Sequence, residues 1–166
     1  SAFAVELASR AGVHVSDELT WVAEQRQESD KGRPDLEGSI DNTPVIKVEA
    51  KLGAAIDCAQ FRSYVEHLQK HLQGRRLDGV LVVLVPRTRT DEATREVKEA
   101  FGLEGPGPWR AKDHPNVTIM VVSWDHLLGV LERVESERFR GELEQFNEMY
   151  QELSGSYIEP LAQRED

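Results

Sequence analysis

The stretch that most constrains the fold of this chain is residues 45–51, which read Val-Ile-Lys-Val-Glu-Ala-Lys. The β-branched residues are typical of a strand, yet three side chains are charged. Because side chains alternate between the faces of a strand, Lys47, Glu49 and Lys51 share one face and the apolar residues between them share the other. We expect the apolar face to pack against a helix and the charged face to point elsewhere. Burying so much charge is costly unless the groups are paired or bind a cation.

A second predicted strand, residues 34–40, precedes this stretch and carries Asp35. The turn-forming residues 41–43 predict a tight hairpin between the two strands. Because a hairpin sets its strands side by side, Asp35 can lie near the end of the next strand that carries Glu49 and Lys51. The sequence therefore predicts two carboxylates and a lysine close together.

These groups are suited to metal-assisted hydrolysis of a phosphodiester bond. Asp35, Glu49 and the main-chain carbonyl of Ala50 would form a half-shell of oxygen atoms, which suits a hard ion such as Mg²⁺ that keeps several waters. Mn²⁺ accepts the same kind of ligand. Lys51 beside the ion could orient the attacking water or stabilise charge on the phosphate. The plainer alternative is an ordinary ion pair between Glu49 and Lys51 on the solvated side of a sheet.

The remaining hydrophobic patterns predict a layered α/β fold in one domain, residues 1–166. The predicted elements are a helix at 2–11, strands at 19–27, 34–40 and 45–51, a helix at 57–72, a strand at 80–85, a helix at 91–101, a strand at 117–122, and helices from 124 and near 137–153. The first three strands should form an antiparallel meander. The helix after them should cross over to a strand parallel to the third.

The charge and cysteine content limit the classes of protein that fit. A formal net charge of −10 argues against a non-specific nucleic-acid coat protein, but metal-holding carboxylates are themselves negative. The single cysteine, Cys58, excludes an internal disulfide and favours a reducing compartment. Without a signal-peptide pattern or an apolar run of about 20 residues, we expect a cytoplasmic protein with no membrane partner. Since the sequence begins with Ser1, we expect a trimmed chain that lacks an N-terminal segment.

The residues described above also carry a resemblance to the PD-(D/E)XK nuclease superfamily. The resemblance rests on Pro34-Asp35, Glu49-Ala50-Lys51 and Gln60-x-x-x-Tyr64. It implies a restriction-endonuclease-like, three-layer α/β core with a central mixed β-sheet flanked by helices, in the order αβββαβ. That core would cover about residues 1–85, and residues 86–166 would add a further αβαα.

The resemblance also implies a role for each residue of the motif. Asp35 and Glu49, with the carbonyl of Ala50, would hold Mg²⁺ or Mn²⁺, and Lys51 would be the catalytic lysine. Gln60 would support the site or contact the DNA backbone. Many members add an acidic residue from the first helix. Here that residue would be Glu6, Glu24 or a residue in a segment before Ser1, and the sequence does not distinguish among the three.

The leading hypothesis from the sequence is a Mg²⁺-dependent deoxyribonuclease whose partner is nucleic acid, with DNA favoured over RNA. The acidic remainder of the chain suggests a local groove for the substrate, and a homodimer is one way to build it. The alternative keeps the fold without the chemistry, as an inactive module that binds protein or nucleic acid in a defence, repair or mobile-element system. A stand-alone acidic interaction protein is the third option.

Other candidate residues have plainer interpretations. His67 and His71 are four apart on the predicted helix, a spacing that can bind zinc but that here favours a solvated flank. Arg87 and Arg89 follow a buried strand, where they would lie in a soluble loop or meet a DNA backbone. Cys58 lacks the histidine and acid that a nucleophile needs.

Overall fold

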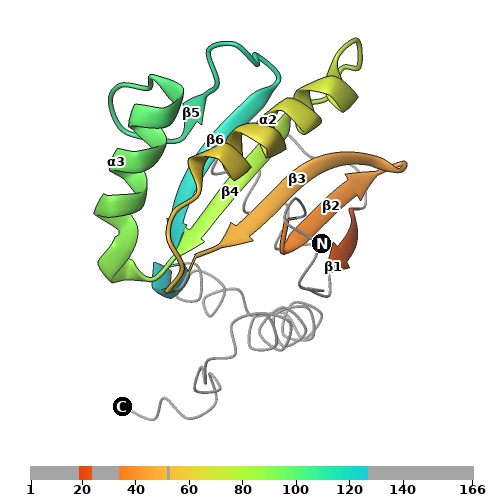
Figure 1. The fold of residues 1–166 in the computed structure, drawn as a ribbon. Helices are drawn as coiled ribbons and strands as arrows, with labels where there is room; N and C mark the ends of the chain where they lie inside the picture. Colours follow the sequence, from red (N-terminus) through yellow and green to blue (C-terminus); the bar gives the residue numbers. More distant parts are fainter. Residues whose placement is uncertain (1–18, 24–33, 52, 127–166) are drawn as a thin grey trace.

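A computed structural model describes residues 19–23, 34–51 and 53–126, and within these ranges six strands form one mixed sheet (Figure 1). The elements are β1 (Thr20–Ala23), β2 (Leu36–Ile40), β3 (Thr43–Ala50), α2 (Cys58–Leu72), β4 (Gly79–Val85), the 3-10 turn η1 (Arg87–Arg89), α3 (Thr90–Phe101), β5 (Trp109–Arg110) and β6 (Val117–Ser123). The strand order across the sheet is β1-β2-β3-β4-β6-β5. The α/β class expected from the sequence is therefore correct.

The first three strands form the predicted antiparallel meander, and β3, β4 and β6 run parallel to one another. The turn between β2 and β3 consists of Asp41 and Asn42, whose φ angles are 47° and 61°. Two successive residues with positive φ match a tight hairpin turn with the right-handed twist of the strands. The crossover through α2 to a strand parallel to β3 is confirmed as well.

Helix α2 packs against β3 and β4 through an apolar stripe of four fully buried side chains: Phe61, Val65, Leu68 and Leu72. Each such side chain contributes about 1.5–3 kcal/mol when removed from water. Gly79 at the start of β4 allows the helix to approach, because a Cβ there would lie 2.5 Å from Leu72 Cδ1. The sequence predicted this stripe and the end of the helix correctly.

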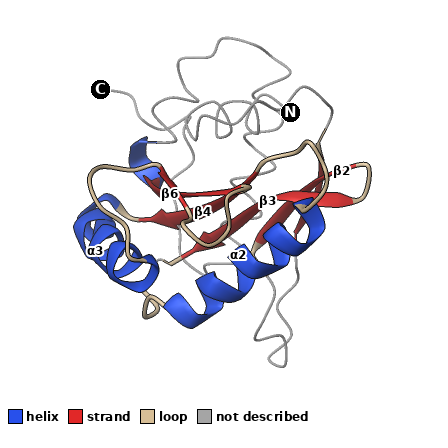
Figure 2. Ribbon diagram, turned by 90° about the horizontal axis from the view of Figure 1, so that it is seen from above, coloured by secondary structure: helices blue, strands red, loops and turns tan. Residues whose placement is uncertain are grey.

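Both described helices, α2 and α3, lie on the same face of the sheet (Figure 2). The helices predicted at 2–11 and 137–153 fall outside the described residues, as does the helix from 124 beyond residue 126. The three-layer arrangement therefore stays a prediction. Among the described residues, no helix has the length and apolar character needed to cross a membrane.

The expectation that the charged face of β3 points away from a helix was wrong. Helix α2 covers the face that carries Lys47, Glu49 and Lys51, since Tyr64 and Gln60 of α2 contact these side chains. The physical reason is that the helix brings polar groups of its own to this face, which satisfy the charges. Apolarity of a strand face therefore did not decide which side the helix covers.

Two smaller corrections concern the second half of the described chain. The sequence predicted no helix or strand between residues 101 and 117, but Trp109 and Arg110 form β5 beside β6. This strand of two residues is too short for a periodic signal, and the buried Trp109 anchors it with a hydrogen bond from Nε1 to the Gly105 carbonyl. Helix α3 begins at Thr90, one residue before the predicted start, and it ends at Phe101 as predicted, with Gly102 (φ 61°) directly after it.

Candidate active site

The pairing of β2 with β3 ends with Leu36 opposite Val48, and the same register continued by one residue would set Asp35 opposite Glu49. Ile40 lies opposite Thr43 next to the hairpin turn, and this register would set Asp35 opposite Val48, on the wrong face. A β-bulge between Gly38 and Ser39 shifts the register by one residue. A shift of one residue moves side chains to the other face of the pairing, so the bulge gives Asp35 the same face as Glu49.

The main chain of Ala50 anchors the Asp35 carboxylate. The Ala50 amide donates a hydrogen bond to Asp35 Oδ2 at 2.8 Å, whereas the next amide, that of Lys51, donates to the Leu84 carbonyl of β4 at 2.9 Å. In a strand the N–H and C=O of one residue point to the same side. The Ala50 carbonyl is therefore directed to the side on which Asp35 lies.

The three charged groups of the predicted site are nearly inaccessible to solvent. The exposed fractions are 4% for Asp35, 0% for Glu49 and 7% for Lys51. A charge removed from water is strongly destabilising unless other groups hydrogen-bond to it or neutralise it. The contacts around these side chains therefore decide whether the site can exist.

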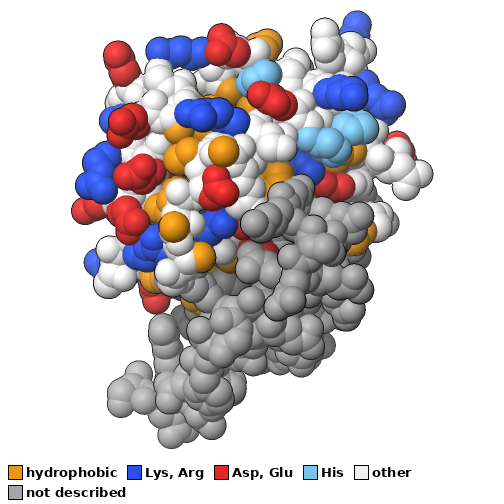
Figure 3. All heavy atoms as spheres, viewed as in Figure 1, with side chains coloured by type: hydrophobic (Ala, Val, Ile, Leu, Met, Phe, Trp, Pro, Cys, Tyr) orange, Lys and Arg blue, Asp and Glu red, His pale blue; other side chains and the backbone are white. Residues whose placement is uncertain are grey.

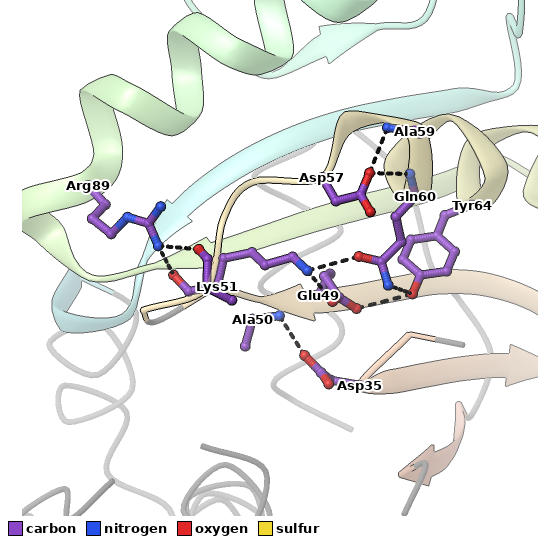
Figure 4. Close-up of polar contacts among 10 residues, drawn as sticks. Asp35, Glu49, Ala50, Lys51, Asp57, Ala59, Gln60, Tyr64 and Arg89 are labelled. Carbon is purple, nitrogen blue, oxygen red and sulfur yellow. Dashed lines mark hydrogen bonds and ion pairs between the residues drawn. The ribbon is translucent and has the colours of Figure 1, made fainter. Parts of the chain in front are cut away.

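Four side chains of β3 and α2 form a closed cycle of polar contacts (Figure 4). Lys51 Nζ donates to Gln60 Oε1 at 2.9 Å, and Gln60 Nε2 donates to the Tyr64 hydroxyl at 2.8 Å. The Tyr64 hydroxyl donates to Glu49 Oε2 at 3.2 Å, and Lys51 Nζ lies 3.0 Å from Glu49 Oε1. The cycle holds a lysine and a carboxylate together in the interior.

The first turn of α2 is fixed by Asp57. The Asp57 side chain accepts hydrogen bonds from the amides of Ala59 and Gln60, both at 3.1 Å, and so caps the helix. This cap sets Gln60 in the first turn, and Tyr64 follows one turn later on the same side. The side of the helix that carries Gln60 and Tyr64 therefore reaches the charged face of β3.

Burial raises the pKa of Tyr64 far above its ordinary value, and the Glu49 charge and hydrogen bond raise it further. The charge of Asp35 acts in the same direction, so this carboxylate is close enough to influence Tyr64. Tyr64 therefore stays protonated and acts as a donor to Glu49. Lys47 Nζ lies over the Tyr64 ring, 5.6 Å from the ring centroid.

A second ion pair lies two residues along the same strands. Lys47 Nζ is 2.5 Å from Glu37 Oε2, and these residues are directly paired across β2 and β3. The Lys47 side chain is buried, while that of Glu37 is 29% exposed. Together the two ion pairs account for Lys47 and Glu49 of β3 and for Lys51, which directly follows the strand.

The donors at this site fit one class of metal ion better than others. Among the described residues, no group of three or more His, Cys, Asp or Glu side chains could hold a metal ion. Asp35, Glu49 and the Ala50 carbonyl offer only oxygen, and few ligands, which suits Mg²⁺ or Mn²⁺ with retained waters. A structural zinc site needs four ligands, mainly nitrogen or sulfur.

The two histidines of α2 contact each other instead of forming a larger cluster. The ring centroids of His67 and His71 lie 4.4 Å apart. Partial desolvation, then the charges of Lys47 and His71, lower the pKa of His67. Acidic and basic side chains are interspersed over the described part of the face in Figure 3, where histidines lie beside Lys and Arg side chains.

Cys58 is a poor candidate for a nucleophile. Its Sγ lies 3.6 Å from the carbonyl oxygen of Glu96, to which it donates a hydrogen bond. Burial and the neighbouring charge of Glu96 raise the pKa of the thiol, so the reactive thiolate is disfavoured.

The structure brings together most of the residues that the sequence singled out: Asp35, Glu49, Ala50, Lys51, Gln60 and Tyr64. The two candidates for an additional acid, Glu6 and Glu24, lie outside the described residues. Sequence reasoning missed the cap at Asp57, for which an Asp before a helical stripe is the usual signal. It also missed the inward direction of Arg89, for which the sequence holds no signal. No protein-family profile, curated protein or solved structure matches this chain.

Proposed function

We propose that this chain is a metal-dependent nuclease that hydrolyses phosphodiester bonds of DNA, with a restriction-endonuclease-like fold of the PD-(D/E)XK type. The observation that carries the proposal is the hydrogen bond from the Ala50 amide to Asp35, which holds this carboxylate at the residue between Glu49 and Lys51. Lys51 Nζ lies 3.0 Å from Glu49 Oε1 and donates to Gln60. These groups come from two strands and one helix. Two carboxylates and a lysine close together are the smallest set of side chains that this metal-assisted reaction needs.

In the proposed mechanism, Asp35, Glu49 and the Ala50 carbonyl would hold Mg²⁺ or Mn²⁺. When bound, the ion supplies a water of lowered pKa and neutralises charge on the phosphate. Lys51 orients the attacking water or stabilises the negative charge that builds on the phosphate oxygens. Gln60 Oε1 accepts a hydrogen bond from the Lys51 ammonium and so fixes the position of this positive charge. The acidic chain favours a local groove as the substrate site, with a homodimer as one way to form it.

The test is cleavage of plasmid and single-stranded DNA with Mg²⁺ or Mn²⁺, in comparison with EDTA. Three variants change the site with little change of shape: Asp35→Asn, Glu49→Gln and Lys51→Met. Each should lower the cleavage rate by about 10²–10⁴-fold, the usual contribution of a positioned charged group to a hydrolytic step. RNA of the same sequence as a second substrate distinguishes a deoxyribonuclease from a nuclease of wider range.

The matched control is Glu37→Gln, which removes a carboxylate of β2 that lies two residues after Asp35 in the chain. This variant should cleave at a rate within about threefold of the wild type, because rates change appreciably only when transition-state contacts are lost. Melting temperatures of all variants identify those that fail to fold. Equal cleavage by the wild type and all three site variants would exclude the proposed reaction.

A second candidate function, an inactive module of the same fold that binds protein or nucleic acid, is favoured by one observation. Glu49 and Lys51 contact each other, and Gln60 and Tyr64 complete the cycle, so the charges are neutralised by the protein alone. Calorimetric titration with Mn²⁺ separates the two functions. Binding that is lost in Asp35→Asn supports the nuclease, and absence of binding supports the inactive module.

A further inference from the structure

Arg89 occupies the last position of η1, between β4 and α3, and its side chain turns back toward the candidate active site (Figure 4). Its Nη1 donates to the main-chain carbonyl of Ala54 at 2.8 Å and to that of Lys51 at 3.4 Å. Only 18% of the side chain is exposed. The guanidinium therefore contacts the main chain just before and just after residues 52–53, in the connection from β3 to α2.

The other edge of the guanidinium is held by Glu92 in the first turn of α3. Arg89 Nε and Nη2 donate to the two carboxylate oxygens of Glu92 at 3.0 Å and 2.9 Å. A bidentate pair of this kind fixes the plane of the guanidinium, which a lysine ammonium could not do. Glu92 thereby directs Nη1 of Arg89 to the two carbonyls.

The connection between β3 and α2 has few other contacts of its own. Gly53, Ala54 and Ala55 are exposed, and a Cβ at Gly53 would meet nothing within 4 Å. The Lys51 amide bonds to β4, and Ile56 packs partly against the core. Between these two points, the hydrogen bonds that the described main chain receives come from Arg89, to the carbonyls of Lys51 and Ala54.

We propose that Arg89 is a positioning residue: by holding the carbonyls of Lys51 and Ala54, it sets Lys51, directly after β3, in register with Gln60 of α2. This role rests on the proposed function, because Lys51 is the group whose position matters for the reaction. The lysine stem is flexible, so its ammonium reaches a fixed place only when its main chain and its partner are both fixed. A displacement of about 1 Å in a catalytic group can lower a rate by about 10²-fold.

The test uses Arg89→Met, which removes the donors, and Arg89→Lys, which keeps the charge and a single donor group. Arg95→Met is the matched control, since Arg95 lies on α3 with 69% of its side chain exposed. Hydrogen exchange of the amides of residues 53–57 reports on the connection, and single-turnover cleavage at saturating DNA reports on chemistry. The NMR signals of the Gln60 side-chain amide report on its contact with Lys51.

Arg89→Met should speed exchange at residues 53–57, shift the Gln60 amide signals and slow single-turnover cleavage by about 10- to 100-fold. Apparent DNA affinity should stay within about threefold, because the guanidinium is already engaged by Glu92 and by the carbonyls of Lys51 and Ala54. Arg89→Lys should recover part of the rate, and Arg95→Met should behave as the wild type.

Three outcomes would overturn the positioning role. These are unchanged exchange, faster exchange with an unchanged cleavage rate, and a loss of DNA affinity with an unchanged rate. An inactive wild type would instead overturn the proposed function. In that case the NMR signals of the Gln60 side-chain amide test the positioning role of Arg89. A shift of these signals in Arg89→Met and none in Arg95→Met supports the positioning of Gln60 against Lys51. No shift in Arg89→Met overturns it.

Discussion

Glu49 Oε1 lies 3.0 Å from Lys51 Nζ, and both residues are almost completely buried. Glu49 is near the end of β3, and Lys51 directly follows that strand. Two side chains on the same face of a strand are next to each other along its axis, so their contact needs no help from the tertiary fold. Their burial does need help, because an ion pair removed from water is stable only when its remaining donors and acceptors are satisfied. Helix α2 supplies the Gln60 and Tyr64 groups that do so.

Removing the Tyr64 hydroxyl tests the cycle of polar contacts. Tyr64→Phe leaves Glu49 Oε2 without that donor, so the free energy of unfolding should fall by about 1–3 kcal/mol, as measured by urea denaturation. In a double-mutant cycle with Glu49→Gln, the two changes should couple by about 0.5–3 kcal/mol. Strictly additive changes would show that the two side chains do not interact.

The pKa of His67 provides a test of the second ion pair. Lys47→Met should raise that pKa toward its ordinary value, since the Lys47 charge is one cause of the lowering. Titration of the imidazole proton signals by NMR measures it, and the more distant Lys98→Met is the control. An unchanged His67 titration in Lys47→Met would contradict the arrangement of these side chains.

The lowered pKa of His67 also has a consequence for stability. Below the ordinary histidine pKa of about 6.5, the unfolded chain binds a proton that the folded chain does not bind until the pH reaches the lower folded pKa. Stability from this group is therefore present above about pH 6.5 and is lost as the pH falls toward the folded pKa. His67→Gln should flatten the dependence of unfolding free energy on pH in that window, and an identical pH dependence would contradict it.

Two glycines that differ in their surroundings test the packing of α2. Gly79→Ala should destabilise the protein by about 1–3 kcal/mol, because the new Cβ would lie 2.5 Å from Leu72 Cδ1. Gly53→Ala is the matched control, since nothing lies within 4 Å of its Cβ position. Thermal unfolding of both variants measures the difference, and equal melting temperatures would mean that α2 does not approach β4 this closely.

Asp57 is expected to contribute through the helix cap. Asp57→Ala should lower the free energy of unfolding by about 0.5–2 kcal/mol, because the amides of Ala59 and Gln60 lose their acceptor. Asp113→Ala, in an exposed loop, is the control and should stay within about 0.5 kcal/mol of the wild type. If both variants have the same stability in urea, the cap contributes nothing.

The sequence by itself determined the local elements and part of the site. The hydrophobic period predicted the meander, the stripe of α2 and the buried strands β4 and β6, because these depend on neighbours along the chain. The alternation of side chains in a strand required Glu49 and Lys51 to share a face. A hairpin of two adjacent strands was enough to bring Asp35 into their neighbourhood.

Only the tertiary structure decided how these pieces meet. The bulge at Gly38 and Ser39 shifts the register so that Leu36 pairs with Val48 and Asp35 reaches the Ala50 amide, and no simple periodicity predicts a register shift of one residue. The face of β3 that α2 covers depended on the polar groups that the helix brings to the charged strand, and the sequence-based expectation was wrong there. The inward direction of Arg89 likewise depends on carbonyls 35 and 38 residues away in the chain. Contacts between segments so distant in sequence leave no local pattern, so they arise only when the chain is folded.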